Sequence, residues 1–400
     1  MNSRLFGGIL LVTGTAVGAG MLALPVLTAM AGFYPSILLF TAIWLGTIFT
    51  AFLVMEVNLW FDHEVNLISM AKYTLGKYGA MITWVLFLLL LYSLTSAYLA
   101  GSGLIMSKVA MQLFGVTLPF YVEPLPLVLL FALFVYCGTR PVDYLNRIFM
   151  IGLVVAYFGL IIWALPDVKL NLLSVVEPSF LWGAVPVVVT SFGFHIIIPV
   201  LTDYLKRDVK SIKKAIIIGS LVPLVIYVIW ELVILGIVPL EGDMGLVSTL
   251  KRGSMATESL AEILKNDWIT TFAESFSIFA LLTSFLGVSL SLSSFLRDGF
   301  NIKQSGSGKF FVVCLTFIPP LIFVFLFPRG FILALQYAGI IVAVLSGILP
   351  ALMAWKGRLM KKEVVLYKTR GGYTSLILAI FFSLIVIGLE IAEKLDWIKV

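Results

Sequence analysis

The stretch GTAVGAGMLALP, residues 14–25, lies inside an apolar run that is long enough to cross a lipid bilayer. It carries Gly14, Gly18 and Gly20, and Pro25 ends it. Glycine inside a helix costs about 1 kcal/mol relative to alanine, and proline costs more. In lipid, a freed backbone group has no water to bind. We therefore predict that this membrane helix is broken at Gly18–Gly20 for a functional reason, and that Gly14 serves helix packing.

The composition of the whole chain is that of a membrane protein. Of its 400 residues, 61% are hydrophobic and 12% are charged, whereas about a quarter are charged in soluble domains. Eleven apolar runs approach or exceed the roughly 20 residues of a spanning helix. They cover about 6–31, 35–58, 80–107, 124–139, 142–165, 181–203, 213–239, 268–296, 309–327, 331–355 and 372–395. We expect an all-α polytopic membrane protein, with residues 1–400 forming a single transmembrane domain.

Lysine and arginine residues are unequally divided between the connections. With the N-terminus placed in the cytoplasm, 19 of the 27 Lys and Arg residues fall on the cytoplasmic side. Such a bias predicts the orientation of a multi-pass protein. We expect a cytoplasmic N-terminus and, with eleven spans, an external C-terminus in the cell inner membrane. The basic excess is thereby explained by topology, and no nucleic-acid partner is expected.

A second interruption lies in the sixth run. The motif TSFGFH, residues 190–195, is polar and contains Gly193, and Pro199 follows six residues later. In the first run, Pro25 follows Gly18 by seven residues. The two interruptions lie five spans apart, so their helices run in opposite directions.

Other features repeat with the same offset. The connections 59–79 and 240–267 each contain an amphipathic segment, and the connections after the fourth and ninth runs are both tight. This pattern predicts an inverted repeat of five spans, residues 1–165 and 181–355, with the helix at 372–395 appended. Discontinuous helices at matching positions of two inverted halves indicate a transporter site near the middle of the membrane.

A broken helix presents unpaired backbone groups to a ligand. Amides near Ala19 and Met21 would hold a carboxylate at the positive end of a half-helix, and freed carbonyls would hold an ammonium group. An α-amino acid carries both. Phe192 and Phe194 would stack on an aromatic ring, although core packing is the ordinary role of such residues. The expected substrate-binding residues are Gly18, Ala19, Gly20, Met21, Tyr92, Ser96, Ser191, Phe192, Gly193, Phe194, Ser284 and Tyr337, with Ser93, Tyr98, Ser289 and Gln336 at similar depth.

Four titratable residues within the runs are candidates for ion coupling. Ionisable groups inside a membrane are costly and often functional. His195 lies at the second interruption, and histidine titrates near neutrality; alternatively, a neutral His195 binds freed carbonyls. Glu231 and Glu274 lie inside spans, and Glu56 is close enough to a span end to be a solvated interfacial residue.

Motifs along the chain resemble a known family. GTAVGAGMLALP in the first run, TSFGFH in the sixth, TSFLGV in the eighth and FPRGF…YAG before and within the tenth are similar to those of the bacterial aromatic amino acid permeases, and most of all to their tyrosine-specific branch. The resemblance extends over essentially the whole chain. It implies a LeuT-type fold and proton-coupled uptake of tyrosine by alternating access. Tryptophan or phenylalanine as substrate, and sodium coupling through Thr283 and Ser284, are the alternatives.

Two other functional classes fit the sequence less well. A channel would carry a filter motif rich in charges or carbonyls, and no such run is present. An intramembrane enzyme would need a nucleophile and a base, and His195 has no partner motif such as GxSxG. We therefore expect a transporter without enzymatic activity. The chain has two cysteines and two histidines, and no cofactor or metal is expected.

Overall fold

The computed structural model describes residues 3–63, 65–137, 139–303, 305–360 and 366–395. Within them, all regular structure is helical. The first half of the chain contains α1 (Ser3–Ala16), η1 (Ala19–Leu22), α2 (Leu24–Thr28), α3 (Phe33–Asn58), α4 (Leu67–Phe114), α5 (Leu125–Cys137), α6 (Thr139–Ala164), η2 (Leu165–Asp167) and η3 (Leu170–Ser174). The second half contains η4 (Pro178–Ala184), α7 (Val185–Ser191), η5 (His195–Ile197), α8 (Ile198–Tyr204), α9 (Val209–Ile237), α10 (Leu246–Arg252), α11 (Ala256–Leu264), α12 (Asp267–Gly299), α13 (Gly306–Leu326), α14 (Phe331–Ala343), the π-helical turn η6 (Val344–Ile348), α15 (Leu349–Met360) and α16 (Gly372–Lys394).

These helices account for every apolar run predicted above. In the described residues, nine helical stretches are long and apolar enough to cross a membrane, and a tenth is formed if α1 is joined to η1 and α2 across a 47° bend. The apolar part of α5, Leu125–Tyr136, is shorter than the others. The prediction of an all-helical polytopic protein is confirmed.

The amphipathic segments predicted in two connections are also helices. The first is the start of α4, which is kinked at Gly76, where φ is 81°; glycine adopts this left-handed backbone without a steric penalty. The second comprises α10 and α11. The first short helix therefore leads into the long part of α4 after Gly76, and the second leads into α12.

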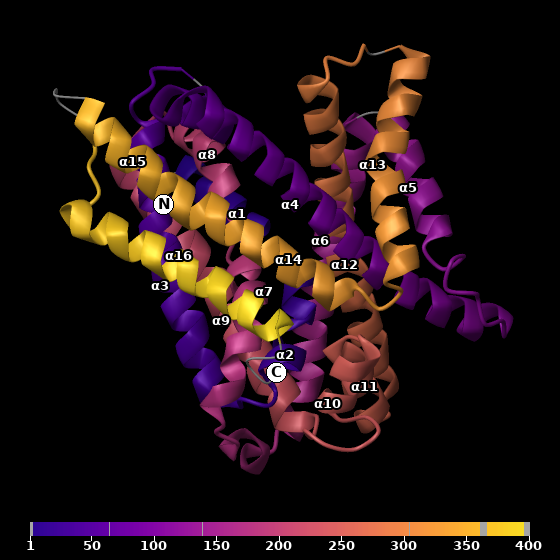
Figure 1. The fold of residues 1–400 in the computed structure, drawn as a ribbon. Helices are drawn as coiled ribbons and strands as arrows, with labels where there is room; N and C mark the ends of the chain where they lie inside the picture. Colours follow the sequence, from indigo (N-terminus) through magenta and orange to yellow (C-terminus); the bar gives the residue numbers. More distant parts are fainter. Residues whose placement is uncertain (1–2, 64, 138, 304, 361–365, 396–400) are drawn as a thin grey trace.

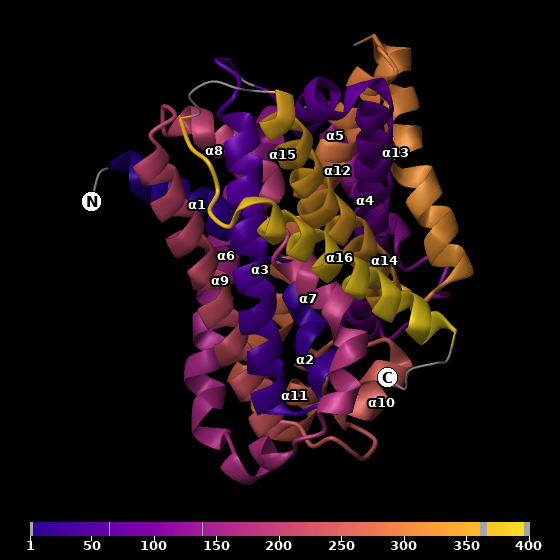
Figure 2. The same ribbon diagram turned by 60° about the vertical axis from the view of Figure 1, so that its left-hand side comes forward.

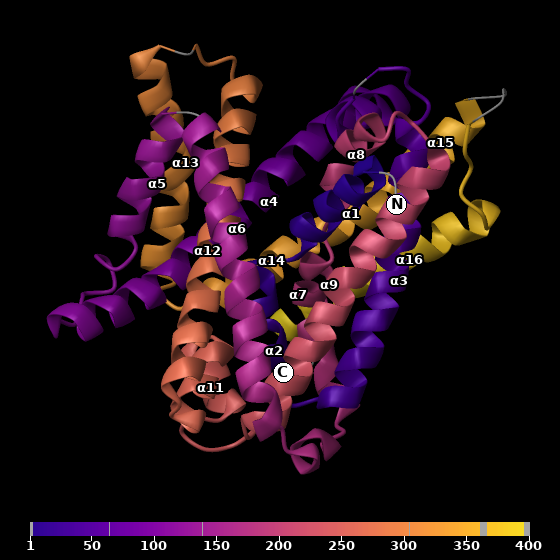
Figure 3. The same ribbon diagram turned by 180° about the vertical axis from the view of Figure 1, so that it is seen from behind.

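Helix–helix contacts occur in pairs, and the helices of one contact lie five spans along the chain from the helices of the other. α6 packs along α12, and α4 packs along α14 (Figure 3). Likewise, α1 packs against α9 and α3 packs against α8. In the order of spans predicted from the sequence, α6 and α14 are the fifth and tenth and α4 and α12 are the third and eighth. Each contact therefore has a counterpart five spans away.

The broken spans lie in the interior of this bundle. We call the end at which α1 begins and α3 and α15 end the N-terminal face, and the other end the opposite face (Figure 1). Between them, η1 contacts α2, α7 and α12, and α7 also contacts α3 (Figure 2). The two interruptions predicted from the sequence therefore meet near the centre of the molecule.

Candidate functional site

The first break is an extended residue followed by a short 3-10 turn. α1 ends at Ala16, and Gly18 has φ −165° and ψ −166°. The turn Ala19–Leu22 leads into α2, whose first turn contains Pro25. Proline is well suited to a first helical turn, where its missing N–H leaves no hydrogen bond unmade. Pro25 thus restarts the helix that the glycines interrupt.

Close approach explains two of the three glycines. A Cβ on Gly18 would lie 2.7 Å from Ser284 Oγ, and one on Gly20 would lie 3.1 Å from Ser191 Oγ. A side chain at Gly18 would displace Ser284 Oγ, and one at Gly20 would require Ser191 Oγ to shift by a few tenths of an ångström. A Cβ on Gly14, in contrast, would have nothing within 4 Å. The expectation that Gly14 serves helix packing is therefore wrong.

The amides at this break already have partners in this conformation. The Ala19 amide donates to Ser284 Oγ at 2.9 Å, and the Met21 amide donates to the Gly18 carbonyl at 3.2 Å. Ala19 is 0% and Met21 1% exposed. The break is closed, and Ser284 occupies the acceptor position predicted for a substrate carboxylate.

The second break is built from bulky side chains. α7 ends at Ser191, and the backbone then turns through Phe192 and Gly193 to η5 and α8. Phe192 packs against Tyr227 with ring centroids 5.2 Å apart, and Phe194 stacks on His195 at 5.2 Å. Both phenylalanines are fully buried. In this conformation they pack in the core, which is the alternative that the sequence left open.

One hydroxyl group joins the two breaks. Tyr227 Oη lies 2.7 Å from the carbonyl oxygen of Ala16 and 2.9 Å from that of Ser191, the last residues of α1 and α7. One turn further along α9, Trp230 Nε1 donates to the Met21 carbonyl at 3.0 Å. The sequence reasoning missed these two residues. Their spacing of three, with Glu231 next, places all three on neighbouring positions of one helix face, and that pattern could have identified them.

Among the predicted residues of α4, Tyr98 is buried, with its side chain 7% exposed. Tyr92 instead donates its hydroxyl to the Leu315 carbonyl of α13 at 2.8 Å, and Ser96 is buried within the helix. Tyr92, although predicted, therefore points toward α13 and not toward the breaks. On α14, Tyr337 is 40% exposed, so its side chain is not enclosed with the central cluster either.

The hydroxyls proposed for a cation site are bound to the protein. Thr283 donates to the Phe279 carbonyl at 2.8 Å, one turn back in α12, and Ser284 accepts from Ala19. In the described residues, no group of three or more His, Cys, Asp or Glu side chains is placed to hold a metal ion.

His195 connects the second break to α3. Its Nε2 lies 2.8 Å from Thr50 Oγ1. Its Nδ1 is buried without a hydrogen-bond partner among the described residues, and the side chain is 4% exposed. The ring therefore retains one free nitrogen at the break.

Glu231 has a comparable arrangement on α9. The side chain is fully buried, and the Thr28 hydroxyl at the end of α2 is hydrogen-bonded to its Oε1. Its Oε2 has no hydrogen-bond partner in the described part of the chain. This carboxyl group thus holds the half-helix after the first break to α9.

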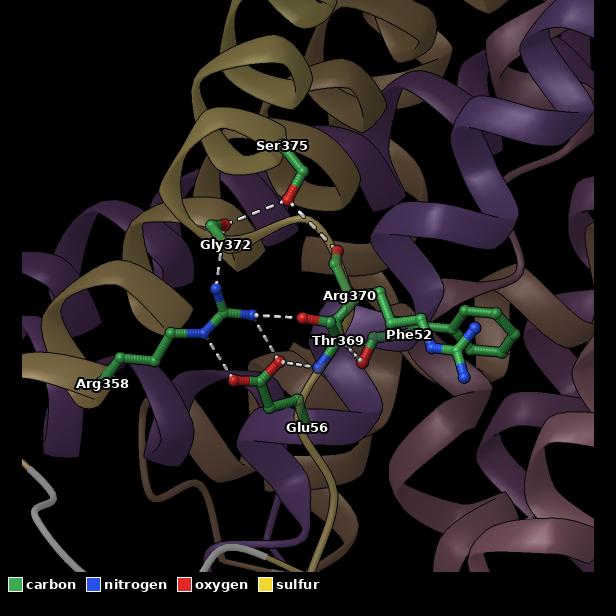
Figure 4. A network of polar contacts seen from close by, with 7 residues as sticks. All are labelled: Phe52, Glu56, Arg358, Thr369, Arg370, Gly372 and Ser375. Atoms are coloured by element: carbon green, nitrogen blue, oxygen red, sulfur yellow. Dashed lines mark hydrogen bonds and ion pairs between the residues drawn. The ribbon is translucent and has the colours of Figure 1, made fainter.

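Glu56 lies in a buried network at the N-terminal face (Figure 4). Arg358 Nε and Nη2 bind its two carboxylate oxygens at 2.7 Å each, and the Thr369 amide donates to Oε2 at 2.7 Å. Glu56 is 0% exposed, so the interpretation of a solvated interfacial carboxylate is wrong. The network joins α3, α15 and the connection that leads to α16.

The remaining acidic residues lie away from the breaks. Glu274 pairs with Lys108 at 2.9 Å, and both side chains are partly exposed. Gln336 Nε2 donates to Glu393 at the end of α16 at 2.9 Å. Glu390, also in α16, is 1% exposed. The sequence reasoning omitted Glu390 from the titratable groups, although it lies inside the predicted span 372–395.

Comparison with known proteins identifies the family. The model of the tryptophan/tyrosine permease family matches residues 1–390. "Tyrosine-specific transport system 2" of Haemophilus influenzae is 31% identical over 396 residues, which cover 96% of each chain. "Tryptophan-specific transport protein" of the same organism is 32% identical, covering 99% of this chain and 97% of the relative. "Glutamine transporter 2" of Aliivibrio fischeri is 30% identical, covering 97% and 99%. The chain belongs to the tryptophan/tyrosine permease family.

Proposed function

We propose that this protein imports tyrosine across the cell inner membrane by proton symport with alternating access. The observation that carries the proposal is the meeting of two broken helices, where Ser284 and Tyr227 bind backbone groups that the breaks leave without helical partners. Helix breaks of this kind at matching positions are typical of transporter binding sites.

The proposed architecture is a LeuT-type bundle of eleven spans. Residues 1–165 and 181–355 form its inverted halves, and α16 is the additional helix. The paired contacts of α6 with α12 and of α4 with α14 support this division, because an inverted repeat must produce each contact twice. The short α5 counts as the fourth span, which needs local thinning of the bilayer or burial of its ends.

In the proposed substrate complex, the amino acid takes over contacts that the protein now makes with itself. Its carboxylate replaces Ser284 Oγ at the Ala19 amide, in line with the preference of helix N-termini for anions. Its ammonium group binds carbonyls at Ala16 and Ser191, where Tyr227 now lies. Tyr98 and the phenylalanines of the second break enclose the ring.

Tyrosine is the proposed substrate, and tryptophan and phenylalanine are the alternatives. The relatives named for tyrosine and for tryptophan are equally similar to this chain. Among the residues themselves, Phe194 in the SFGFH motif favours the tyrosine branch. Competition of each amino acid against labelled tyrosine distinguishes these substrates.

His195 is the proposed proton carrier. It lies at the second break, and Nδ1 has no hydrogen-bond partner among the described residues. In the tautomer in which Nε2 donates to Thr50, the ring can therefore take up a proton at Nδ1 and keep that hydrogen bond. Glu231 is the alternative, since its Oε2 is also free among the described residues. Glu274 remains a further candidate, whereas Glu56 is already neutralised by Arg358. For sodium coupling, Thr283 and Ser284 would have to give up the contacts described above.

The decisive experiment separates the two driving ions. We expect purified protein in proteoliposomes to accumulate labelled tyrosine when a pH gradient, acidic outside, is imposed in sodium-free buffer. A sodium gradient at equal pH should produce only equilibration. If a sodium gradient alone drives accumulation, sodium and not the proton is the coupling ion. If no aromatic amino acid shows saturable uptake, the proposed function itself is contradicted.

The proposed orientation has a cytoplasmic N-terminus and an external C-terminus. It rests on the asymmetry of Lys and Arg between the connections. An epitope tag at the C-terminus should be accessible to antibody on spheroplasts with an intact inner membrane. A tag that is reached only after permeabilisation would contradict the orientation or the number of eleven spans.

A further inference from the structure

Thr50 on α3 has one hydroxyl proton and two kinds of neighbour. Its Oγ1 lies 2.8 Å from His195 Nε2 at the second break, and 3.2 Å from each of the Gly46 and Thr47 carbonyl oxygens of its own helix. Thr50 is 6% and His195 4% exposed, so both side chains are buried. A hydroxyl group donates one hydrogen bond, and its oxygen can accept others. The direction of the Thr50 hydroxyl therefore decides whether His195 Nε2 carries a hydrogen.

The number of hydrogen bonds distinguishes the two neutral forms of the ring. If Nδ1 carries the hydrogen, the hydroxyl donates to Nε2, and the Nδ1–H group stays buried without an acceptor among the described residues. If Nε2 carries the hydrogen, it donates to Thr50 Oγ1 while the hydroxyl donates to a carbonyl of α3, as threonine commonly does in helices. This second form makes one more hydrogen bond and satisfies both donors. It is therefore favoured, because a buried donor without an acceptor is costly.

The surroundings of the ring contain no charged group that would set its form instead. Its turn, η5, packs against α1 and α8, and the ring stacks on Phe194. The titratable side chains on α1, α3 and α8 are Arg4, Tyr34, Glu56, Asp203 and Tyr204. Those on α3 and α8 lie more than one helical turn along the chain from Thr50 or His195, and Arg4 lies at the start of α1. In the described part of the chain, no carboxylate forms an ion pair with His195.

We propose that Thr50 is a positioning residue for proton coupling, because it accepts a hydrogen bond from His195 Nε2 and thereby leaves Nδ1 as the nitrogen that takes up the transported proton. This rests on the proposed function, in which His195 carries the proton. A proton that binds Nδ1 makes the ring a cation, and Nε2–H keeps its hydrogen bond to Thr50. The same proton leaves from Nδ1 on release. The ring therefore completes the cycle without turning over and without exchanging its second hydrogen.

The first test observes the ring directly. The chain has two histidines, so His63→Asn, a change at an exposed position, leaves His195 as the only histidine. Full-length protein with this change is labelled with isotopic histidine, reconstituted in lipid and measured by NMR at about pH 8, well above the ordinary pKa of histidine. Ring nitrogens with and without hydrogen have well-separated shifts. We expect the hydrogen on Nε2, and a ring with its hydrogen on Nδ1 would overturn the inference.

Three variants in this background show whether Thr50 is the cause. Thr50→Val removes the acceptor, and we expect the ratio of the two neutral forms to shift about fivefold toward Nδ1–H, as for the loss of one ordinary hydrogen bond. Thr50→Ser keeps a hydroxyl group and should restore the original ratio. The matched control is Thr41→Val, which removes a hydroxyl bound to the Ile37 carbonyl at 2.8 Å in the same helix. An unchanged ratio in Thr50→Val would overturn the inference.

The second test is the pH profile of tyrosine uptake in proteoliposomes. In Thr50→Val the charged ring has lost the acceptor for Nε2–H, so it binds a proton less readily. We expect the external pH of half-maximal accumulation to move about one unit lower, while exchange between equal pools continues and Thr50→Ser keeps the wild-type profile. Equal losses of exchange and accumulation at an unchanged pH profile would show a structural role and overturn the inference.

Failure of the proposed function gives a different result. Wild-type protein that transports no aromatic amino acid would overturn that function, and so would a His195→Gln variant that still concentrates tyrosine overturn His195 as the carrier. Either outcome is independent of the NMR measurement, which reports the form of the ring whether or not the protein transports.

Discussion

The two helix breaks meet in the core of the bundle but are built from different residue types. At the first break side chains are absent, and Gly18 and Gly20 leave room for Ser284 and Ser191 to approach the backbone. At the second break the side chains are large, and Phe192 and Phe194 are fully buried against Tyr227 and His195. A break without side chains depends on its neighbours for hydrogen bonds, whereas a break with large side chains is also held by packing. The two should therefore respond differently to substitution.

The largest effect is expected at the first break. In Gly18→Val, the new side chain would displace Ser284 Oγ, which lies 2.7 Å from the ideal Cβ position. We expect tyrosine uptake in proteoliposomes to be abolished while the protein is still inserted. The control is Gly14→Val, a position with nothing within 4 Å of the Cβ, which should transport at nearly the wild-type rate. Normal uptake by Gly18→Val would mean that the contact between Ser284 and the first break is not needed for transport.

At the second break, we expect His195→Gln to retain movement of tyrosine across the membrane but to lose its coupling to the proton gradient. The amide is of similar size and retains a hydrogen-bonding group for Thr50, so the packing of the break is preserved. We expect exchange of tyrosine between equal pools to continue and accumulation driven by a pH gradient to be lost. If the variant still concentrates tyrosine, His195 has a structural role and Glu231→Gln becomes the next variant to measure.

Tyr227→Phe tests whether the two breaks act together. It removes only the hydroxyl that lies between the Ala16 and Ser191 carbonyls. Leaving a buried polar group unsatisfied costs about 1–3 kcal/mol. We expect a lower thermal unfolding midpoint in detergent, together with slower exchange. Tyr157→Phe, which loses a hydroxyl bound to the Ile226 carbonyl at 3.0 Å, is the matched control and should affect stability but not exchange.

The smallest effect is expected for Ser284→Ala. The hydroxyl contributes one hydrogen bond to the Ala19 amide at 2.9 Å, and a typical hydrogen bond contributes about 0.5–1.5 kcal/mol. In our proposal, substrate replaces this contact. Tyrosine affinity should therefore be unchanged or slightly higher in the variant, as measured by equilibrium binding. A loss of affinity greater than about tenfold would show that Ser284 binds substrate directly.

The sequence predicted what depends on local signals. Apolar length defined the spans, and glycine followed by proline marked both breaks, because these residues act on their own stretch of backbone. Which side of a span faces the site was much harder to predict. Tyr92 and Tyr98 lie in one apolar helix, yet Tyr92 donates to the Leu315 carbonyl of α13, whereas Tyr98 is buried in the core. A helix surrounded by lipid and by other helices is apolar on every side, so hydrophobic periodicity gives little information about its facing.

Partners far apart in the chain were equally hard to predict. Arg358 is 302 positions from Glu56, and no spacing rule relates them. For the same reason, the sequence predicts a solvated Glu56, whereas the residue is buried and paired with Arg358.

That network also has a consequence for the order of synthesis. Glu56 lies in one of the first helices to leave the ribosome, whereas Arg358 and Thr369, which bind its carboxylate, are among the last residues to be made. During synthesis, the carboxylate lacks the partners that the finished protein gives it, and an uncompensated charge in a membrane helix is costly. The network can therefore form only after the chain has been made as far as Thr369. The Glu56 network thus acts as a late step of assembly that a truncated chain cannot complete.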